Sequence, residues 1–259
     1  MMSDVILETE NLRREFGALV AVDDMSISIA AGSLHSIIGP NGAGKTTFFN
    51  LVSGTLRPTS GKVFFKGDDI TSLPVHRTIH RGIGRSFQIT NLFPNLTVLE
   101  NVRLAAQAMG RDSLRFFKSH QKLTRYLERS QEVLGQVGLA DKALQLAGTL
   151  PHGDQRKLEL GMILAPDPEV LMLDEPTAGM ASEQVPELMQ LVQSIQDAGD
   201  KTVVLVEHNM NVVMSVSDRI TVMHQGGLLA EGTPAEISAD ERVQTAYLGE
   251  LYKDSDGAA

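Results

Sequence analysis

One glycine-rich stretch of the chain combines residue types that bind phosphate. It has the spacing G-x-x-x-x-G-K-[ST], in which glycines let the backbone curl so that successive N–H groups point at phosphate oxygens. Lys45 is long enough to reach the β- and γ-phosphates of a nucleotide, and the Thr46 hydroxyl can ligate Mg²⁺. The helix predicted to start at Gly44 adds free amides and the positive end of its dipole. The predicted nucleotide-binding loop consists of Gly39, Pro40, Asn41, Gly42, Ala43, Gly44, Lys45, Thr46 and Thr47.

Two adjacent carboxylates follow an apolar run at residues 170–173. Asp174, at the end of this predicted strand, is placed to hold the ligand shell of Mg²⁺. Glu175 can orient an attacking water or accept a proton from it. Taken alone, a strand followed by Asp-Glu more often marks only the start of a loop. Together with the phosphate loop, the pair indicates nucleotide hydrolysis.

Strands and helices that alternate along the chain would position these residues. Residues 34–38 have the pattern of a buried strand and lead directly into the phosphate loop, and a helix is predicted over residues 44–53. Further strands are predicted at residues 170–173 and 202–206, with an amphipathic helix between them. A strand, a crossover helix and a second strand form a βαβ unit, which predicts a parallel sheet.

Shorter signals indicate additional elements. Runs at residues 5–7, 26–30 and 62–66 predict strands, and a turn is predicted at residues 67–69. The spacing of apolar residues predicts helical structure from residue 97 to 144.

The composition of the 259 residues is that of a globular protein, with 42% hydrophobic and 21% charged residues. The net charge of −9 argues against nucleic acid as a partner, and the absence of cysteine excludes disulfides and thiolate metal sites. Six of the seven histidines, at positions 35, 76, 80, 120, 152 and 224, do not have metal-site spacing. The acidic N-terminus does not resemble a signal peptide, and no apolar run approaches the roughly 18 residues of a membrane span. We expect a soluble protein, or at most a peripheral one.

Four further stretches resemble motifs of the ABC ATPase family, and the resemblance covers nearly the whole chain. LPHGDQRKLELGMILA (150–165) resembles the family signature and its helix, GRSFQ (84–88) resembles the Q-loop, and VEH (206–208) resembles the switch-histidine segment. REFGALVAVDD (14–24) contains an aromatic residue where the family stacks adenine. Singly, each residue has an ordinary interpretation: a surface glutamine, a structural histidine or a core phenylalanine. Their order and spacing together favour the family.

The resemblance implies roles for residues outside the phosphate loop. Gln88 would sense Mg²⁺ and the attacking water, His208 would contact the γ-phosphate, and Phe16 would stack on adenine. The implied catalytic set consists of Glu175, Gln88 and His208. Mg²⁺ would be held, partly through water, by Thr46, Gln88 and Asp174. The signature residues Pro151, His152, Gly153 and Asp154 would face the ATP of a partner subunit.

The resemblance also implies the fold class and the domain organisation. The expected fold is the α/β P-loop NTPase core of ABC ATPases, with a mostly parallel sheet, an N-terminal antiparallel β subdomain and an inserted α-helical subdomain. We expect a single ATP-binding domain over residues 1–259. Its helical subdomain, about residues 92–162, would lie between residues 1–91 and 163–240, and residues 241–259 would form a C-terminal tail.

Within the family, the chain most resembles the ATP-binding subunits of branched-chain amino acid importers, and the related amide and urea importers share much of the same sequence. The stretches that carry this resemblance are GRSFQITNLFPNLTVLENV, DEPTAGM, LLAEGTPAEI and AYLG. The implied partners are two membrane permeases, a second ABC ATPase subunit and an extracytoplasmic substrate-binding protein. The implied cofactors are ATP and Mg²⁺. Such a subunit would lie in the cytoplasm, on the inner face of the plasma membrane, and would close on ATP to move the permeases.

The signature departs from the family pattern. The family usually has LSGGQ, whereas this chain has LPHGD at residues 150–154. Pro151 provides neither a hydroxyl nor a backbone N–H to a partner's γ-phosphate, which removes about 1.5–3 kcal/mol of closed-state stability. Asp154 adds negative charge unless it points away, and Ala181 replaces an aspartate of many relatives. We therefore expect asymmetry, with efficient hydrolysis only at the site built on this chain's phosphate loop, and a heterodimer rather than a homodimer.

Three other functions remain as alternatives. Pro151 and Ala181 favour an ATP-binding regulatory subunit with weak hydrolysis, whereas Glu175 and His208 oppose it. A soluble ABC ATPase acting on DNA or ribosomes would need a coiled-coil insertion or a basic groove, and a small-molecule kinase would not need the family motifs. The basic stretch 111–129 has the pattern of a solvated helix face, with contact to permeases or anionic lipid headgroups as the alternative.

Overall fold

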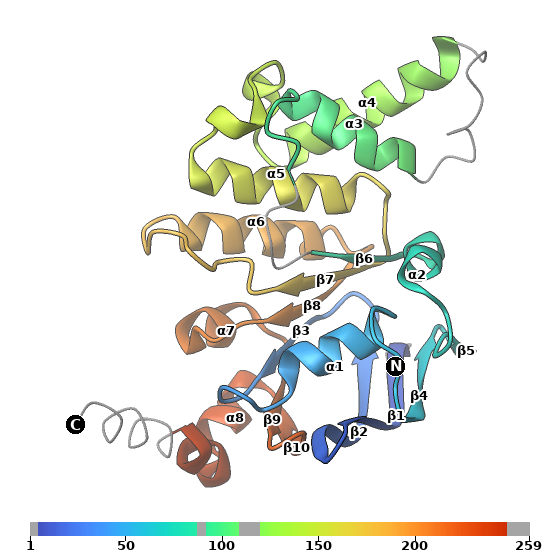
Figure 1. The fold of residues 1–259 in the computed structure, drawn as a ribbon. Coiled ribbons are helices and arrows are strands. Elements are labelled where there is room, and N and C mark those ends of the chain that lie inside the picture. Colours follow the sequence, from blue (N-terminus) through green and yellow to red (C-terminus); the bar gives the residue numbers. More distant parts are fainter. Residues whose placement is uncertain (1–4, 87–91, 109–119, 248–259) are drawn as a thin grey trace.

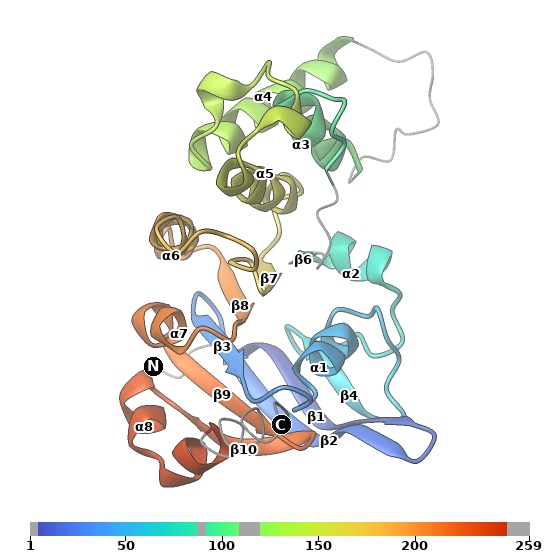
Figure 2. The same ribbon diagram turned by 60° about the vertical axis from the view of Figure 1, so that its left-hand side comes forward.

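The computed structural model describes residues 5–86, 92–108 and 120–247 of the chain. Gln88 and residues 111–119 of the basic stretch lie outside the described residues. Figures 1 and 2 show two sheets in the lower part of the molecule and a group of helices above them. Within the described residues, no helix is both long enough and apolar enough to cross a membrane.

The first sheet is antiparallel throughout. It contains β1 (Val5–Phe16), β2 (Leu19–Ala30), β4 (Ser60–Phe65) and β5 (Asp68–Asp69) in the order β2-β1-β4-β5. The run predicted at residues 5–7 is the beginning of β1, and the run predicted at residues 26–30 is the end of β2. The turn predicted at residues 67–69 is wrong by one position: Lys66 and Gly67 form it with positive φ angles, and the two aspartates pair with β4.

The second sheet carries the predicted strands that flank the site. Its order is β10-β9-β3-β8-β7-β6, and all neighbours are parallel except β10 and β9. Every residue of β3, β7 and β8 is buried, as is typical of parallel strands covered on both faces. The predicted βαβ unit is confirmed. The strands are β3 (Leu34–Ile38), β6 (Ile83–Arg85), β7 (Val170–Asp174), β8 (Thr202–Val206), β9 (Arg219–His224) and β10 (Gly227–Gly232).

Helices cover both faces of the second sheet. Helix α1 (Lys45–Val52) lies on one face, between the two sheets, and its buried Phe48 and Phe49 pack into the core that they share. Helices α6 (Val185–Asp197) and α7 (Met210–Val216) lie on the opposite face (Figure 2). The short helices α2 (Val75–Arg81) and α8 (Pro234–Ala239) also belong to this part, and residues 241–247 are helical as well.

A separate group of helices occupies the top of Figure 1. It consists of α3 (Val98–Ala108), α4 (His120–Gln136), α5 (His152–Leu164) and two 3₁₀ turns, Ala140–Lys142 and Ala147–Thr149. The predicted helical segment 97–144 therefore holds two helices, and its last part is wrong. The Leu139 N–H donates to the Leu134 carbonyl over 2.8 Å, a bond that closes α4 and turns the chain away.

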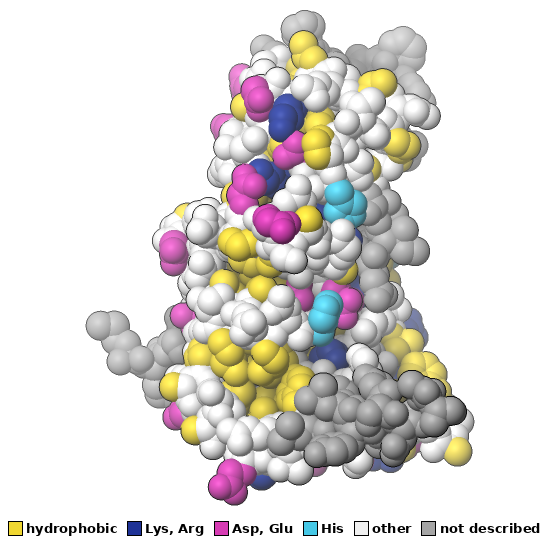
Figure 3. Space-filling model, turned by 90° about the vertical axis from the view of Figure 1, so that its left-hand side faces the viewer, with side chains coloured by type: hydrophobic (Ala, Val, Ile, Leu, Met, Phe, Trp, Pro, Cys, Tyr) yellow, Lys and Arg dark blue, Asp and Glu magenta, His cyan; other side chains and the backbone are white. Residues whose placement is uncertain are grey.

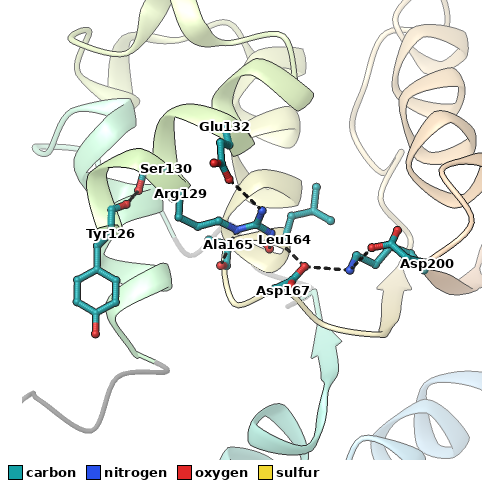
Figure 4. A network of polar contacts seen from close by, with 9 residues as sticks. Tyr126, Arg129, Ser130, Glu132, Leu164, Ala165, Asp167 and Asp200 are labelled. Carbon is teal, nitrogen blue, oxygen red and sulfur yellow. Dashed lines mark hydrogen bonds and ion pairs between the residues drawn. The ribbon is translucent and has the colours of Figure 1, made fainter. Parts of the chain in front are cut away.

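Arg129 links this group of helices to the second sheet (Figure 4). Its guanidinium donates to the carbonyls of Leu164 and Ala165, at 3.0 and 3.4 Å, and so satisfies the C-terminal end of α5. It also pairs with Asp167 at 3.2 Å, and Asp167 pairs with Lys201 at 2.9 Å, just before β8. Arg129 therefore does not belong to a freely solvated basic face, as predicted for residues 111–129, but to a partly exposed polar bridge between two parts of the fold.

Candidate active site

The phosphate loop joins the end of β3 to the start of α1, as the sequence predicts. Gly44 caps the helix with φ 97°, a conformation that side chains disfavour. There is also no room for side chains: a Cβ on Gly39 would lie 2.2 Å from the Met223 carbonyl oxygen, and one on Gly44 would lie 2.2 Å from that of Ala21. The two outer glycines of the motif are therefore required by the approach of β9 and β2.

Lys45 is held against the loop that precedes it. Its side chain is buried, and its Nζ donates to the carbonyls of Gly39 and Pro40 at 2.6 and 2.9 Å. Thr46 is exposed beside it and Thr47 is half-buried. The lysine cation therefore lies at the mouth of the loop, where phosphate oxygens would replace or share its carbonyl partners.

Asp174 ends β7 with a buried carboxyl group that has unused hydrogen-bonding capacity. Its backbone N–H donates to Ser86 Oγ at 2.8 Å, but neither of its buried carboxyl oxygens has a hydrogen-bond partner in the described structure. Burial raises the pKa of Asp174, and the charges of Arg85 and Lys45 oppose this shift. A buried carboxyl group that accepts no hydrogen bond is costly, and a divalent cation would compensate it.

The remaining ligands of such a cation would not come from an acidic cluster. Within the described ranges, no group of three or more His, Cys, Asp or Glu side chains could hold a metal ion. This arrangement fits Mg²⁺, which commonly takes one or two carboxylates and completes its shell with phosphate oxygens and water. Asp174 and the hydroxyl of Thr46 fit that pattern, and Gln88 lies outside the described residues.

Glu175 and His208 approach each other at the ends of β7 and β8. Glu175 has φ 47°, and its N–H donates to the Val206 carbonyl at 2.8 Å. A positive φ is uncommon outside glycine and is found where a site determines the backbone. His208 Nδ1 lies 4.0 Å from Glu175 Oε1, and the two side chains are 63% and 32% exposed. Both groups are therefore open to a ligand, and either could orient a water molecule between them.

Arg85 is a residue that the sequence analysis missed. Its guanidinium is almost fully buried, 4.0 Å from the carboxyl group of Asp174, and stacks 4.9 Å from the ring centroid of Phe49. It donates to Ser53, Thr55 and Asn50, at or just after the end of α1, over 2.5–2.8 Å. Burial lowers the pKa of Arg85, and Asp174 opposes this shift. The only sequence signal was a basic residue in the GRSFQ stretch.

Phe16 lies at the end of β1 and is not a core residue. Its side chain is 45% exposed, which excludes the alternative interpretation of a core phenylalanine. The guanidinium of Arg14 lies 4.6 Å from the centroid of its ring. An accessible aromatic ring is what adenine stacking needs, and that role remains a prediction.

The signature begins α5 at the protein surface. Pro151 is the N-cap, with no side chain that bonds the first turn, and both Pro151 and His152 are exposed while Gly153 is buried. Asp154 does not point freely outward: its carboxyl group lies 2.6 Å from Lys142 and 3.8 Å from Lys157. Two cations therefore offset the negative charge that the sequence introduces here.

The phosphate loop, the loop after Glu175 and the start of α5 all open toward the left-hand side of Figure 1. Figure 3 views this side directly and shows histidine side chains exposed on it. The His152 ring lies next to Gly179, in the loop after Glu175: a Cβ built on that glycine would meet it at 3.6 Å. The fold thus brings three motifs that are far apart in the sequence onto one side.

A sequence profile described as ABC transporter matches residues 22–178. The chain belongs to the ABC transporter family. Residues 228–252 of this cassette also match a profile described as branched-chain amino acid ATP-binding cassette transporter.

Curated relatives align with the cassette from end to end. The cassette is 38% identical over 256 residues to the high-affinity branched-chain amino acid transport ATP-binding protein LivG of Salmonella typhimurium, covering 96% of this chain and 100% of LivG. BraF of Pseudomonas aeruginosa, described in the same words, has the same identity and coverage.

A solved structure has the same fold. The ADP conformation of MJ1267, an ATP-binding cassette of an ABC transporter, superposes with a TM-score of 0.82 at 30% identity, covering 95% of this chain and 99% of that one. The predicted fold class is confirmed, and the cassette is an ATP-hydrolysing subunit of an ABC transporter.

Proposed function

We propose that this cassette hydrolyses ATP with Mg²⁺ to drive import of branched-chain amino acids or related amino acids and amides. The observation that carries the chemistry is that the buried Asp174 carboxyl group, which accepts no hydrogen bond, and the open Glu175–His208 pair lie together at adjacent strand ends. The substrate class is supported by the end-to-end similarity to LivG and BraF and by the C-terminal match at residues 228–252.

Each residue has a defined task in this proposal. The amides of residues 39–47 and the Lys45 cation bind the phosphates, while Phe16 stacks on adenine. Asp174, Thr46 and Gln88 would hold Mg²⁺, partly through water, and the ion would supply neutralisation of phosphate charge. Glu175 orients the attacking water and accepts its proton, and His208 stabilises charge on the γ-phosphate.

The proposed assembly contains two membrane permeases, a second ABC ATPase and an extracytoplasmic substrate-binding protein. The names of LivG and BraF support a transport system, and the fold offers a route for coupling: the Asp174 backbone bonds Ser86, two residues before Gln88. ATP would close this cassette on its partner by contacts that exist only in the closed state. The cassette would then act at the cytoplasmic face of the plasma membrane.

A complex reconstituted in lipid vesicles tests this function. Wild-type cassette, permeases and second ATPase should hydrolyse ATP and accumulate radiolabelled leucine, and Glu175→Gln should abolish the hydrolysis at this site while ATP still binds. ATP turnover that is unchanged by Glu175→Gln would refute the catalytic assignment. Turnover without uptake of leucine or of a panel of amides would refute the substrate class.

The regulatory-subunit alternative is favoured by one observation, the exposed proline at the start of α5. The Lys142–Asp154 pair weakens it, because the carboxylate is already compensated within the chain. We propose instead that the defect is confined to the partner's ATP, which favours a heterodimeric motor.

A further inference from the structure

A third carboxyl group, that of Glu207, lies beneath the Glu175–His208 pair. Glu207 follows β8 directly and is fully buried, unlike the two exposed side chains above it. Burying a carboxyl group is unfavourable unless hydrogen bonds compensate for the lost water. The contacts that Glu207 makes therefore indicate why the fold holds it there.

Glu207 connects the loop after Glu175 to the switch segment. Its Oε1 accepts hydrogen bonds from the Thr177 N–H at 3.1 Å and from the Thr177 hydroxyl at 2.6 Å. Its Oε2 accepts from the His208 N–H at 3.2 Å. Both oxygens thus act as acceptors, one toward each loop. Thr177 is itself buried, so these bonds are shielded from water and are stronger for it.

The two loops that Glu207 joins are the ones that carry the catalytic pair. Thr177 lies two residues after Glu175, and the turn between them is closed by a bond from the Ala178 N–H to the Glu175 carbonyl at 3.0 Å. His208 is the next residue after Glu207, and its Nδ1 lies 3.8 Å from Glu207 Oε2. The same carboxyl group therefore holds the backbone on both sides of the 4.0 Å contact between Glu175 and His208.

A second contact holds the same loop from the opposite side. Arg156, in the signature helix α5, donates to the Ala178 carbonyl at 2.8 Å and pairs with Glu159 at 2.8 Å. The loop after Glu175 is thus fixed at Thr177 by the switch segment and at Ala178 by α5.

We propose that Glu207 is a positioning residue for hydrolysis, which sets the separation of Glu175 and His208 by joining Thr177 to the switch backbone. The proposal rests on the function proposed above. Glu207 touches neither nucleotide nor water in this role. Displacement of either loop by about 1 Å is enough to lower a rate by orders of magnitude, because the reacting groups act only in near-contact geometry.

Glu207→Gln is the principal variant, because it keeps the size of the side chain. Its amide oxygen can still accept from Thr177, but its NH₂ group then faces the His208 N–H, donor against donor. We expect kcat of the assembled complex to fall about 10-fold or more, while ATP affinity stays within about 2-fold of wild type. Thr177→Val should lower kcat about 5-fold, and Thr177→Ser, which keeps the hydroxyl, should restore wild-type turnover.

The double variant Glu207→Gln/Thr177→Val distinguishes positioning from general stability. Because both changes remove one linkage, the double variant should be no slower than Glu207→Gln alone. Wild-type turnover and its loss in Glu175→Gln establish the proposed function first, so a failure of either proposal can be told apart. The positioning role would be overturned by any of three results. These are a wild-type kcat in folded Glu207→Gln, effects of the two substitutions that multiply in the double variant, or equal losses in kcat and ATP affinity.

Discussion

The phosphate-loop side and the signature side of the cassette are built differently. At the phosphate loop, two glycines are required by backbone contacts with neighbouring strands, and Lys45 and Asp174 are buried. The signature side starts at an exposed helix end, and Asp154 in its first turn is held by a partly buried pair with Lys142 at the surface. The difference shows that the first side depends on the packed core, whereas the second depends on surface side chains. A signature can therefore depart from its family without a change of fold.

The largest effect should come from Lys45→Ala. This change removes the buried cation of the phosphate loop, and we expect ATP affinity to fall about 100-fold, since bonds from a charged donor to phosphate contribute up to about 3 kcal/mol. The matched control is Lys157→Ala on the signature helix, where a lysine pairs with Asp154 and Glu187. Its ATP affinity should stay within about 2-fold of wild type. A fluorescent ATP analogue titrated into each purified cassette measures both, and equal losses would contradict the comparison.

The core beneath the phosphate loop should be sensitive to acid. Burial, with a smaller contribution from the Arg219 charge, lowers the pKa of His35 in β3 to about 4. The unfolded chain, with a histidine pKa of about 6.5, binds this proton first, so His35 stabilises the fold fully above pH 6.5 and loses this contribution as the pH falls toward 4. The total loss is about 3 kcal/mol. Urea unfolding measured between pH 7 and 4.5 should show that the free energy of unfolding of His35→Gln falls less with decreasing pH than that of wild type. Parallel pH dependences of the two free energies would refute the assignment.

The signature side should improve on substitution. In complexes that carry Glu175→Gln, the remaining turnover comes from the partner's ATP and uses this chain's signature. Adding Pro151→Ser supplies a hydroxyl toward that ATP and should raise the turnover about 10-fold, the lower end for a hydrogen bond to a charged group. Single-turnover hydrolysis by Glu175→Gln complexes with and without Pro151→Ser measures this change. An unchanged rate would refute the proposal of asymmetry.

The smallest effect should come from Lys142→Met. The Lys142 ammonium lies 2.6 Å from Asp154, and its loss should return part of the negative charge to the surface that faces the partner's ATP. We expect hydrolysis of the partner's ATP to be about 2–3-fold slower than in wild type. The rate should return toward the wild-type value as added salt screens the charge, as is typical of ion pairs near the surface. Lys142→Arg is the control and should behave as wild type. A salt-independent loss would point to packing and not to charge.

Much of the fold could be predicted because its signals are local. The strands at residues 34–38 and 202–206 have the predicted bounds, and α1 lies within the predicted 44–53. Continuous apolar runs and glycine spacing determine such elements through adjacent residues. The prediction failed where backbone geometry that the residue types do not reveal moves a boundary. The bond from Leu139 to Leu134 ends α4, and the positive φ angles of Lys66 and Gly67 form the hairpin of β4 and β5.

The sequence by itself determined the phosphate loop, the carboxylate pair at the end of β7 and the membership in a family, since each depends on residue types at short, regular spacing. Only the tertiary structure showed that Arg85 reaches Asn50, 35 residues away, and that Glu207 reaches Thr177, 30 residues away. It also showed that Lys142 compensates Asp154. No local pattern marks such partners, because the packing of separate strands and helices decides which side chains become buried together.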